Sequence, residues 1–240
     1  MCTFKISEDI KNLNTEHIKN NLLLYNYDTR NLKKLIKKEV DKESPSYVSA
    51  YSSFKGEIFE NVIYELLLKY ANQNDDITRF ILKGPHQKRE SDYNKSGLLI
   101  DKSLQIVYKS AYKDISEYDA MFFSKSSIYF VEMSTSKKTA SLNKRLNKKY
   151  ALLKVLFPKL NIKALIVLTE GSSGLKRFPS YCTIWITKDF TDDTLLKEIL
   201  YNKDSKKDSK INLQSFKGRK FIETSVVHYK RFQQCNHQGL

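Results

Sequence analysis

Two carboxylates in the middle of the chain, Asp119 and Glu132, have the type and spacing to hold a divalent cation. They flank an alternating segment that we expect to form a β-hairpin with its loop at 124–127. Pairing of Phe123 with Ile128 then puts the two acids directly opposite each other on one face. Like charges so placed are destabilising, by up to about 1 kcal/mol when exposed. Because Mg²⁺ binds one or two carboxylates while keeping its water, the pair predicts a divalent-cation site.

The sequence leaves two simpler interpretations of this pair open. A shifted strand register would leave both carboxylates in water, where their repulsion is weak. Alternatively, Lys137 or Lys138, which follow the second strand closely, could neutralise them. Either arrangement would remove the need for a metal ion.

A third acid is expected from an amphipathic helix over 54–71. At about 100° per residue, Glu60 lies at the border of the apolar stripe and Glu57 one step further toward solvent. Glu65 points away from the stripe. Glu60 is therefore the helix acid best placed to reach the sheet. The stripe itself comprises Phe59, Val62, Ile63, Leu66, Leu67 and Tyr70.

The elements that must position these acids follow one another as helix, strands, helix and strands. The second helix spans about 139–157, with Leu142, Leu146, Tyr150 and Leu153 inward. The expected strands cover 104–108, 120–123, 128–134, 164–169 and 183–187. This order predicts an α/β or α+β domain with a mixed central sheet flanked by helices.

Outside this core, expected to span 51–190, the ends of the chain differ in character. Residues 1–50 are expected to form a helical N-terminal region, in which Thr15 can cap one helix, Asp28 or Thr29 can cap another, and the run Ser44 to Ser46 breaks the pattern. Residues 191–240 are expected to form a basic C-terminal extension packed on or near the core, with a strand at 221–229.

The charge balance favours a polyanionic partner. Among 240 residues, 42 Lys and Arg stand against 27 Asp and Glu, a formal net charge of +15. Nucleic acid, first of all double-stranded DNA, is the leading partner class. A compositional origin of the lysines and an anionic membrane surface are the competing explanations.

The sequence predicts a cytoplasmic protein without membrane spans. Its apolar runs, such as 164–168, fall far short of the roughly 20 residues needed to cross a bilayer. The first 25 residues lack the pattern of a secretion signal. The 3 cysteines are odd in number and far apart, which fits a reducing compartment.

Three short segments, taken in order, resemble the PD-(D/E)xK nuclease superfamily, which has the restriction-endonuclease-like fold. The segment Phe54-Lys-Gly-Glu-Ile-Phe-Glu60 is similar to the G-x-x-F-E helix of Mrr-like members. Tyr118-Asp119 and then Val131-Glu132-Met133-Ser134 match the strand motifs. The resemblance covers roughly 54–187.

The resemblance implies hydrolysis of phosphodiester bonds with Mg²⁺ or Mn²⁺. Asp119 matches the metal-binding aspartate, Glu132 the second ligand and Glu60 the helix acid. Tyr118 stands where the signature often has proline. Ser134 stands where the motif has a catalytic lysine, and a neutral hydroxyl stabilises developing phosphorane charge poorly.

Superfamily members move that lysine elsewhere or replace it, so the chain can supply another cation. Lys137, Lys138, Arg145 and Lys149 are near enough in sequence. Lys138 and Lys149 are the better candidates, because their long stems can reach back over the edge of the sheet.

Further basic residues are expected to contact phosphates rather than to react. These are Lys137, Lys144, Arg145 and Lys148 near or on the second helix, and Lys230 and Arg231 in the tail. A solvated helix face is the alternative for each of them.

Three functional hypotheses follow from the sequence. The first is a Mg²⁺-dependent DNA endonuclease of restriction or other genome-defence type, and the second is a catalytically inactive nucleic-acid-binding module on the same fold. The third is an interaction protein whose charge is only compositional. The sequence leaves open DNA against RNA, strandedness and whether the chain forms a homodimer.

Overall fold

The computed structural model describes residues 18–25, 27–82, 97–100, 105–110, 113–187, 192–202 and 227–228. The helices are α2 (Lys19–Leu24), α3 (Arg30–Lys37), α4 (Pro45–Gln73), α5 (Ala140–Leu156) and α6 (Asp193–Tyr201), with a 3₁₀ turn η3 (Leu175–Arg177). The strands are β1 (Arg79–Leu82), β2 (Gly97–Ile100), β3 (Ile106–Ser110), β4 (Lys113–Tyr118), β5 (Ala120–Phe123), β6 (Ser127–Ser134), β7 (Asn161–Thr169), β8 (Cys182–Thr187) and β9 (Val227–His228).

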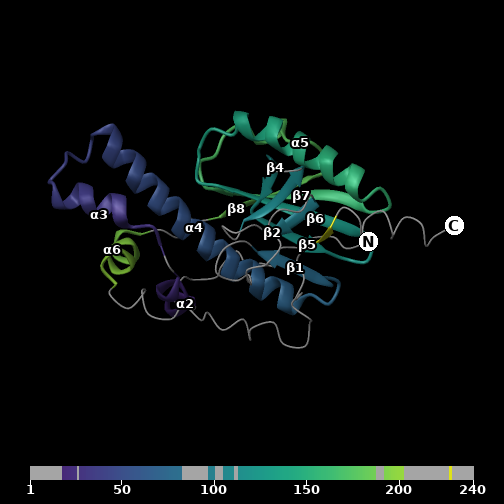
Figure 1. Cartoon of the computed structure of the whole chain (residues 1–240), viewed down its shortest axis with the longest axis horizontal. Helices are drawn as coiled ribbons and strands as arrows, with labels where there is room; N and C mark the ends of the chain where they lie inside the picture. Colours follow the sequence, from purple (N-terminus) through teal and green to yellow (C-terminus); the bar gives the residue numbers. More distant parts are fainter. Residues whose placement is uncertain are drawn as a thin grey trace.

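A mixed five-stranded sheet forms the middle layer of the fold, in the order β1-β5-β6-β7-β8. The pairs β1–β5 and β5–β6 are antiparallel, whereas β6, β7 and β8 run parallel. Helix α5 connects β6 to β7 and covers one face, while α4 crosses the other (Figure 1). The expected α/β class with a mixed sheet between helices is confirmed.

The central strand β6 is apolar on both sides because a helix covers each face of the sheet. Val131 and Met133 belong to the core cluster that contains α4, and Ile128 and Phe130 to the cluster that contains α5. Glu132 follows the alternation of Ile128 and Phe130 and therefore faces α5.

Helix α4 begins nine residues earlier than the sequence predicts. The Ser44 hydroxyl accepts a hydrogen bond from the Tyr47 amide at 3.3 Å, and Pro45 occupies the first turn. Serine followed by proline is a favourable helix start, so the run Ser44 to Ser46, which the sequence predicted to interrupt the helical pattern, is where α4 begins. The added turns carry α4 beyond the sheet, where α3 and α6 lie beside it (Figure 1).

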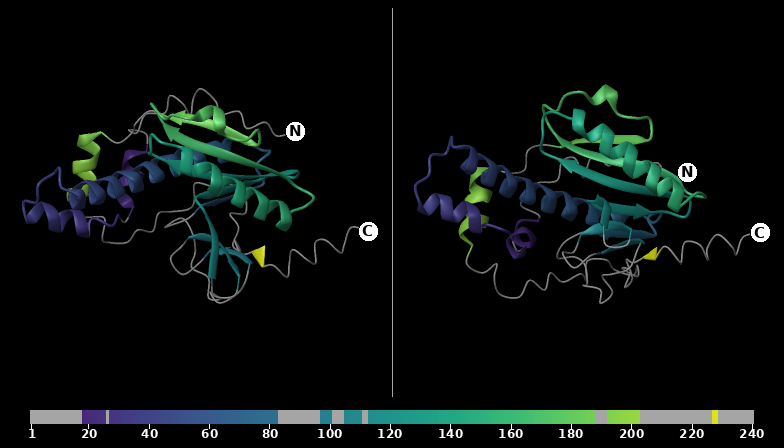
Figure 2. Two further views of the ribbon diagram at one scale, coloured as in Figure 1. Left: turned by 90° about the horizontal axis from the view of Figure 1, so that it is seen from above. Right: turned by 45° about the horizontal axis from the view of Figure 1, so that its top comes forward.

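A second sheet has the order β4-β3-β2-β9. Strands β2, β3 and β4 lie in the chain between β1 and β5, whereas β9 comes after α6. The described strand pairs of this second sheet are antiparallel. Seen from above, its strands project to one side of the five-stranded sheet (Figure 2). Strand β4, which the sequence did not reveal, ends at Tyr118 and leads directly into Asp119. The second sheet therefore leads directly into the acidic residues, and its Leu98, Ile106 and Tyr118 belong to the core cluster that contains α5.

Glu65 does not point into water, as a residue off the apolar stripe would. It is buried beneath α2 and accepts hydrogen bonds from the Tyr25 hydroxyl at 2.7 Å and the Asn21 amide at 3.0 Å. Burial and the nearby Glu65 raise the pKa of Tyr25, which keeps its hydroxyl a donor. The end of α6 also packs here, because the Asn202 side chain donates to the Leu23 carbonyl.

Replacing Tyr25 with phenylalanine is expected to lower the free energy of unfolding by about 1–3 kcal/mol, because a buried carboxylate loses a donor. Urea denaturation followed by circular dichroism measures the change. Tyr51→Phe is the matched control, since the Tyr51 hydroxyl lies 3.4 Å from the exposed Asp193. Equal effects of the two substitutions would show that the Glu65 contact contributes nothing specific.

Candidate active site

A polar cavity of about 380 Å³ opens where β6 runs past the first residue of β5. It brings together residues from α4, β4, β6 and α5 and the bend at Asp119. The lining residues are Glu60, Ile115, Ser116, Glu117, Asp119, Glu132, Met133, Arg145, Lys148 and Lys149. All three acids that the sequence singles out are among them.

The expected hairpin register is confirmed. Phe123 pairs with Ile128, and Ala120 pairs with Val131. Asp119 precedes Ala120 at the bend between β4 and β5, and its Oδ2 accepts a hydrogen bond from the Met133 amide at 2.8 Å. The Asp119 carboxylate is thus fixed beside the last residues of β6.

Glu132 is the most buried acid of the cavity, with 2% of its side chain exposed. Lys149 contacts its Oε1, and the Arg145 guanidinium lies 3.4 Å from its Oε2. Burial, and then the charge of Asp119, raise the pKa of Glu132 to about 7 against the opposing effect of both cations. Near neutral pH the Glu132 carboxyl is therefore populated in both its protonated and its ionised form.

The cations that partner Glu132 come from α5. Lys137 lies elsewhere: its ammonium donates to the Thr169 hydroxyl and to the Glu170 carbonyl, in the loop after β7. Lys138 is exposed, bridges to Ser173 and does not line the cavity. The sequence interpretation in which one of these two lysines neutralises the acids is therefore wrong.

Lys149 is the lysine whose ammonium contacts Glu132 directly. Its side chain is only 12% exposed, and it extends from α5 to Glu132 of β6. Ser134 is instead engaged locally, since its hydroxyl accepts from the Ser136 amide at 3.1 Å. Of the two preferred lysine candidates, the structure brings Lys149 and not Lys138 to the acids.

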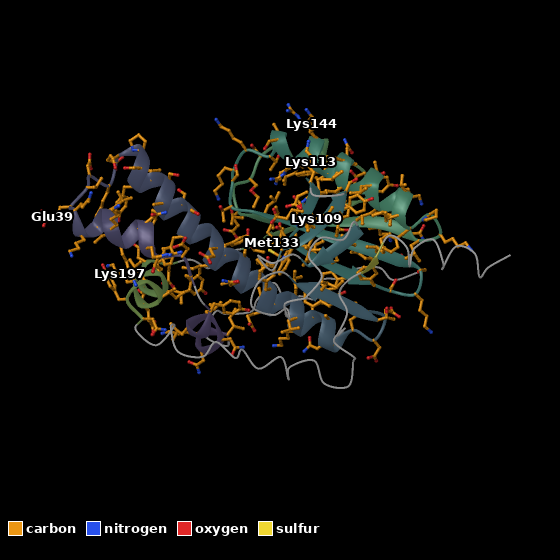
Figure 3. All side chains as sticks on the ribbon, viewed as in Figure 1. Glu39, Lys109, Lys113, Met133, Lys144 and Lys197 are labelled. Carbon is orange, nitrogen blue, oxygen red and sulfur yellow. The ribbon has the colours of Figure 1, made fainter. Side chains whose placement is uncertain are left out.

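The remaining basic candidates lie around the cavity mouth or beyond it. Lys148 donates to the Ile115 carbonyl at 2.7 Å and ties α5 to β4, while Lys144 is exposed. Figure 3 labels Lys144 and Lys113 on the side of α5 and β4, with the cavity residue Met133 nearer the centre. Lys230 and Arg231 lie outside the described residues.

Sequence reasoning missed the wall that β4 contributes, which includes Ile115 and Glu117. Its residues do not alternate between apolar and polar, because the buried positions are Ser116 and Tyr118. A strand whose buried face carries a serine gives no period-2 signal, so no pattern in the sequence could have found it.

The donor set of this cavity fits a hard divalent cation. Within the described parts of the chain, no group of three or more His, Cys, Asp or Glu side chains could hold a metal alone. Mg²⁺ does not need one, because it is commonly bound by one or two carboxylates with water filling the other positions. Asp119 and Glu132 supply two carboxylates in a cavity with room for water.

The sequence matches no protein-family model and no curated protein. Among the described helices, none is long and apolar enough to cross a membrane. What this chain does must therefore be argued from its own residues.

Proposed function

We propose that this protein is a divalent-metal-dependent endonuclease of the restriction-endonuclease-like type that hydrolyses phosphodiester bonds in DNA. The observation that carries the proposal is that Asp119, Glu132 and Lys149, from three separate parts of the chain, line one cavity. Two carboxylates can bind a metal ion, and the nearly buried ammonium beside them supplies a fixed positive charge. Enzymes that catalyse phosphoryl transfer use both kinds of group.

Each of these residues has a role that its position supports. Asp119 and Glu132 would hold Mg²⁺ or Mn²⁺, which when bound supplies Lewis-acid chemistry and a more acidic water. The Lys149 ammonium stabilises the negative charge that develops on the attacked phosphate. Glu60, on the α4 wall of the same cavity, accepts a hydrogen bond from the attacking water and orients it.

The exposed cations of α5 serve binding rather than hydrolysis. Lys144 is exposed, and Arg145 has 57% of its side chain exposed although it pairs with Glu132, so both can approach phosphates that flank the scissile one. Such contacts carry little sequence information and weaken as salt is added. Together with the net charge of +15, they support a polyanionic substrate.

The experiment is cleavage of supercoiled plasmid by the full chain, with Mg²⁺, Mn²⁺ or a chelator present. We expect nicked and linear products with either metal and intact plasmid with the chelator. Intact DNA under every metal condition, with retained salt-dependent binding, would overturn the nuclease proposal.

A second candidate is a nucleic-acid-binding module without activity. Ser134 in the lysine position favours it, as does the pairing of Glu132 with Lys149 and Arg145, because protein cations already offset part of its charge. This candidate predicts binding that is unchanged by chelator and falls steeply with salt. Cleavage in the plasmid experiment would exclude it.

A further inference from the structure

We propose that Tyr118 is a positioning residue that holds the Lys149 ammonium at the acidic cavity. It thereby lets a lysine from α5 act in place of the strand lysine that Ser134 does not provide. The catalytic consequence rests on the proposed function, whereas the contact between the two side chains does not.

The contact is a cation over an aromatic face. The Lys149 ammonium lies 5.3 Å from the centre of the Tyr118 ring while it also touches Glu132. A cation within about 6 Å of a ring centre is attracted by the negative ring face, and the attraction grows when water is excluded. Tyr118 is completely buried and Lys149 nearly so, which meets that condition.

The Tyr118 ring is itself held in place by a second aromatic side chain. Phe130 meets it edge to face, with ring centres 6.1 Å apart and an interplanar angle of 79°. Phe130 and Glu132 point to the same face of β6, since they are two residues apart. Strand β6 therefore carries the Glu132 carboxylate and also, through Phe130, fixes the Tyr118 ring that holds the Lys149 ammonium.

A lysine delivered from a helix needs such a support. Its four-carbon stem loses substantial rotamer freedom when the ammonium is held in one place. Glu132 alone would be an insufficient anchor, because a carboxylate that also held a metal ion would attract the ammonium less. The ring face keeps its attraction when the carboxylate is engaged, so Tyr118 holds Lys149 through the step in which its charge is needed.

Two adjacent residues of this chain thus serve the site from opposite directions. Asp119 accepts from the Met133 amide on β6, and Tyr118 faces Lys149 of α5. Tyr118 and Ser134 are therefore complementary. Ser134 provides no cation from the strand, and Tyr118 holds a cation that comes from α5 instead.

Kinetics of matched variants test the role. Tyr118→Leu removes the ring and is expected to lower kcat for plasmid cleavage by roughly 10- to 30-fold with KM little changed. Tyr118→Phe keeps the ring face and is expected to stay within about 3-fold of the unchanged protein. Tyr129→Leu is the control, because it removes another ring under a lysine, Lys163 at 5.4 Å, outside this cavity. Equal losses of kcat in all three, or none in folded Tyr118→Leu, would overturn the proposal.

A second measurement does not depend on cleavage or on the folding of a variant. In protein with ¹³C-labelled lysine, the ε-methylene protons of Lys149 should resonate upfield of those of the other lysines, because the ammonium next to them lies over the Tyr118 ring. An ordinary shift in the unchanged protein would overturn the positioning role. A clear upfield shift in a protein that never cleaves DNA would instead overturn the proposed function and leave the contact standing.

Discussion

Replacing Asp119 with asparagine is expected to lower metal-dependent cleavage by roughly 10³-fold or more while the free energy of unfolding stays equal or rises. In the unchanged protein the Met133 amide donates to Asp119 Oδ2 at 2.8 Å. Asparagine keeps a side-chain oxygen that can accept this hydrogen bond, so the bend between β4 and β5 is preserved. It removes the charge that the metal needs. It also removes a like charge that raises the pKa of Glu132, which relieves the folded state.

Asp119→Ala separates the two roles of this side chain. Alanine removes the acceptor as well as the charge, so the mostly buried Met133 amide loses its partner, at a cost of about 1–3 kcal/mol. Plasmid cleavage and urea denaturation on the same preparations measure both quantities. We therefore expect two inactive variants, of which only the alanine variant is destabilised.

Glu117→Gln is the matched control, because Glu117 is an exposed acid on the wall of the same cavity. It should change cleavage by no more than a few fold. If it is as inactive as Asp119→Asn, the cavity depends on its total negative charge rather than on ligation by Asp119.

The hairpin that carries the two acids could be predicted because its geometry is local. Alternation fixes the face on which each side chain lies, and the short loop fixes the register, so the pairing of Phe123 with Ile128 followed from the sequence alone. The α5 helix was equally accessible, since Leu142, Leu146 and Leu153 recur at helical spacing and are all buried.

The walls of the site could not be predicted, because tertiary contacts decide them. Strand β4 buries Ser116 beside Tyr118 and shows no apolar period, while the short strands β1 and β2 are too brief to stand out. Glu65 was predicted to be exposed to solvent, because no residue of its own helix indicates that Tyr25 will contact and bury it. The partner that buries Glu65 lies 40 residues away in the chain.

The choice among candidate lysines was also beyond the sequence. Spacing admits Lys138 and Lys149 alike, but Lys138 lies on a turn that bridges to Ser173, whereas Lys149 points back from α5 to the sheet. What separates them is the direction of the chain after β6, which no residue pattern encodes.

Replacing Lys149 with methionine is expected to lower cleavage by about 10²- to 10³-fold, the usual effect of removing one charge-stabilising group. Lys154→Met is the control on the same helix, because the exposed Lys154 ammonium lies 3.5 Å from the Leu160 carbonyl, outside the cavity. A second substitution, Ser134→Lys, should restore part of the lost activity by returning a cation to the strand. Full activity of Lys149→Met would exclude any role for this ammonium in hydrolysis.

The same variant is expected to lose stability in a manner that depends on pH, in metal-free buffer. The folded-state pKa of Glu132 is already raised from 4.5 to about 7, so its contribution to stability falls as the pH rises between these values and is constant above. Without Lys149 the folded-state pKa rises further, and the fall continues above pH 7 at up to about 1.4 kcal/mol per pH unit. The gap in unfolding free energy between the two proteins should therefore be small at pH 6 and widen toward pH 9. A gap that stays constant across this range would mean that Arg145 alone keeps Glu132 ionised, and that Lys149 is not its principal partner.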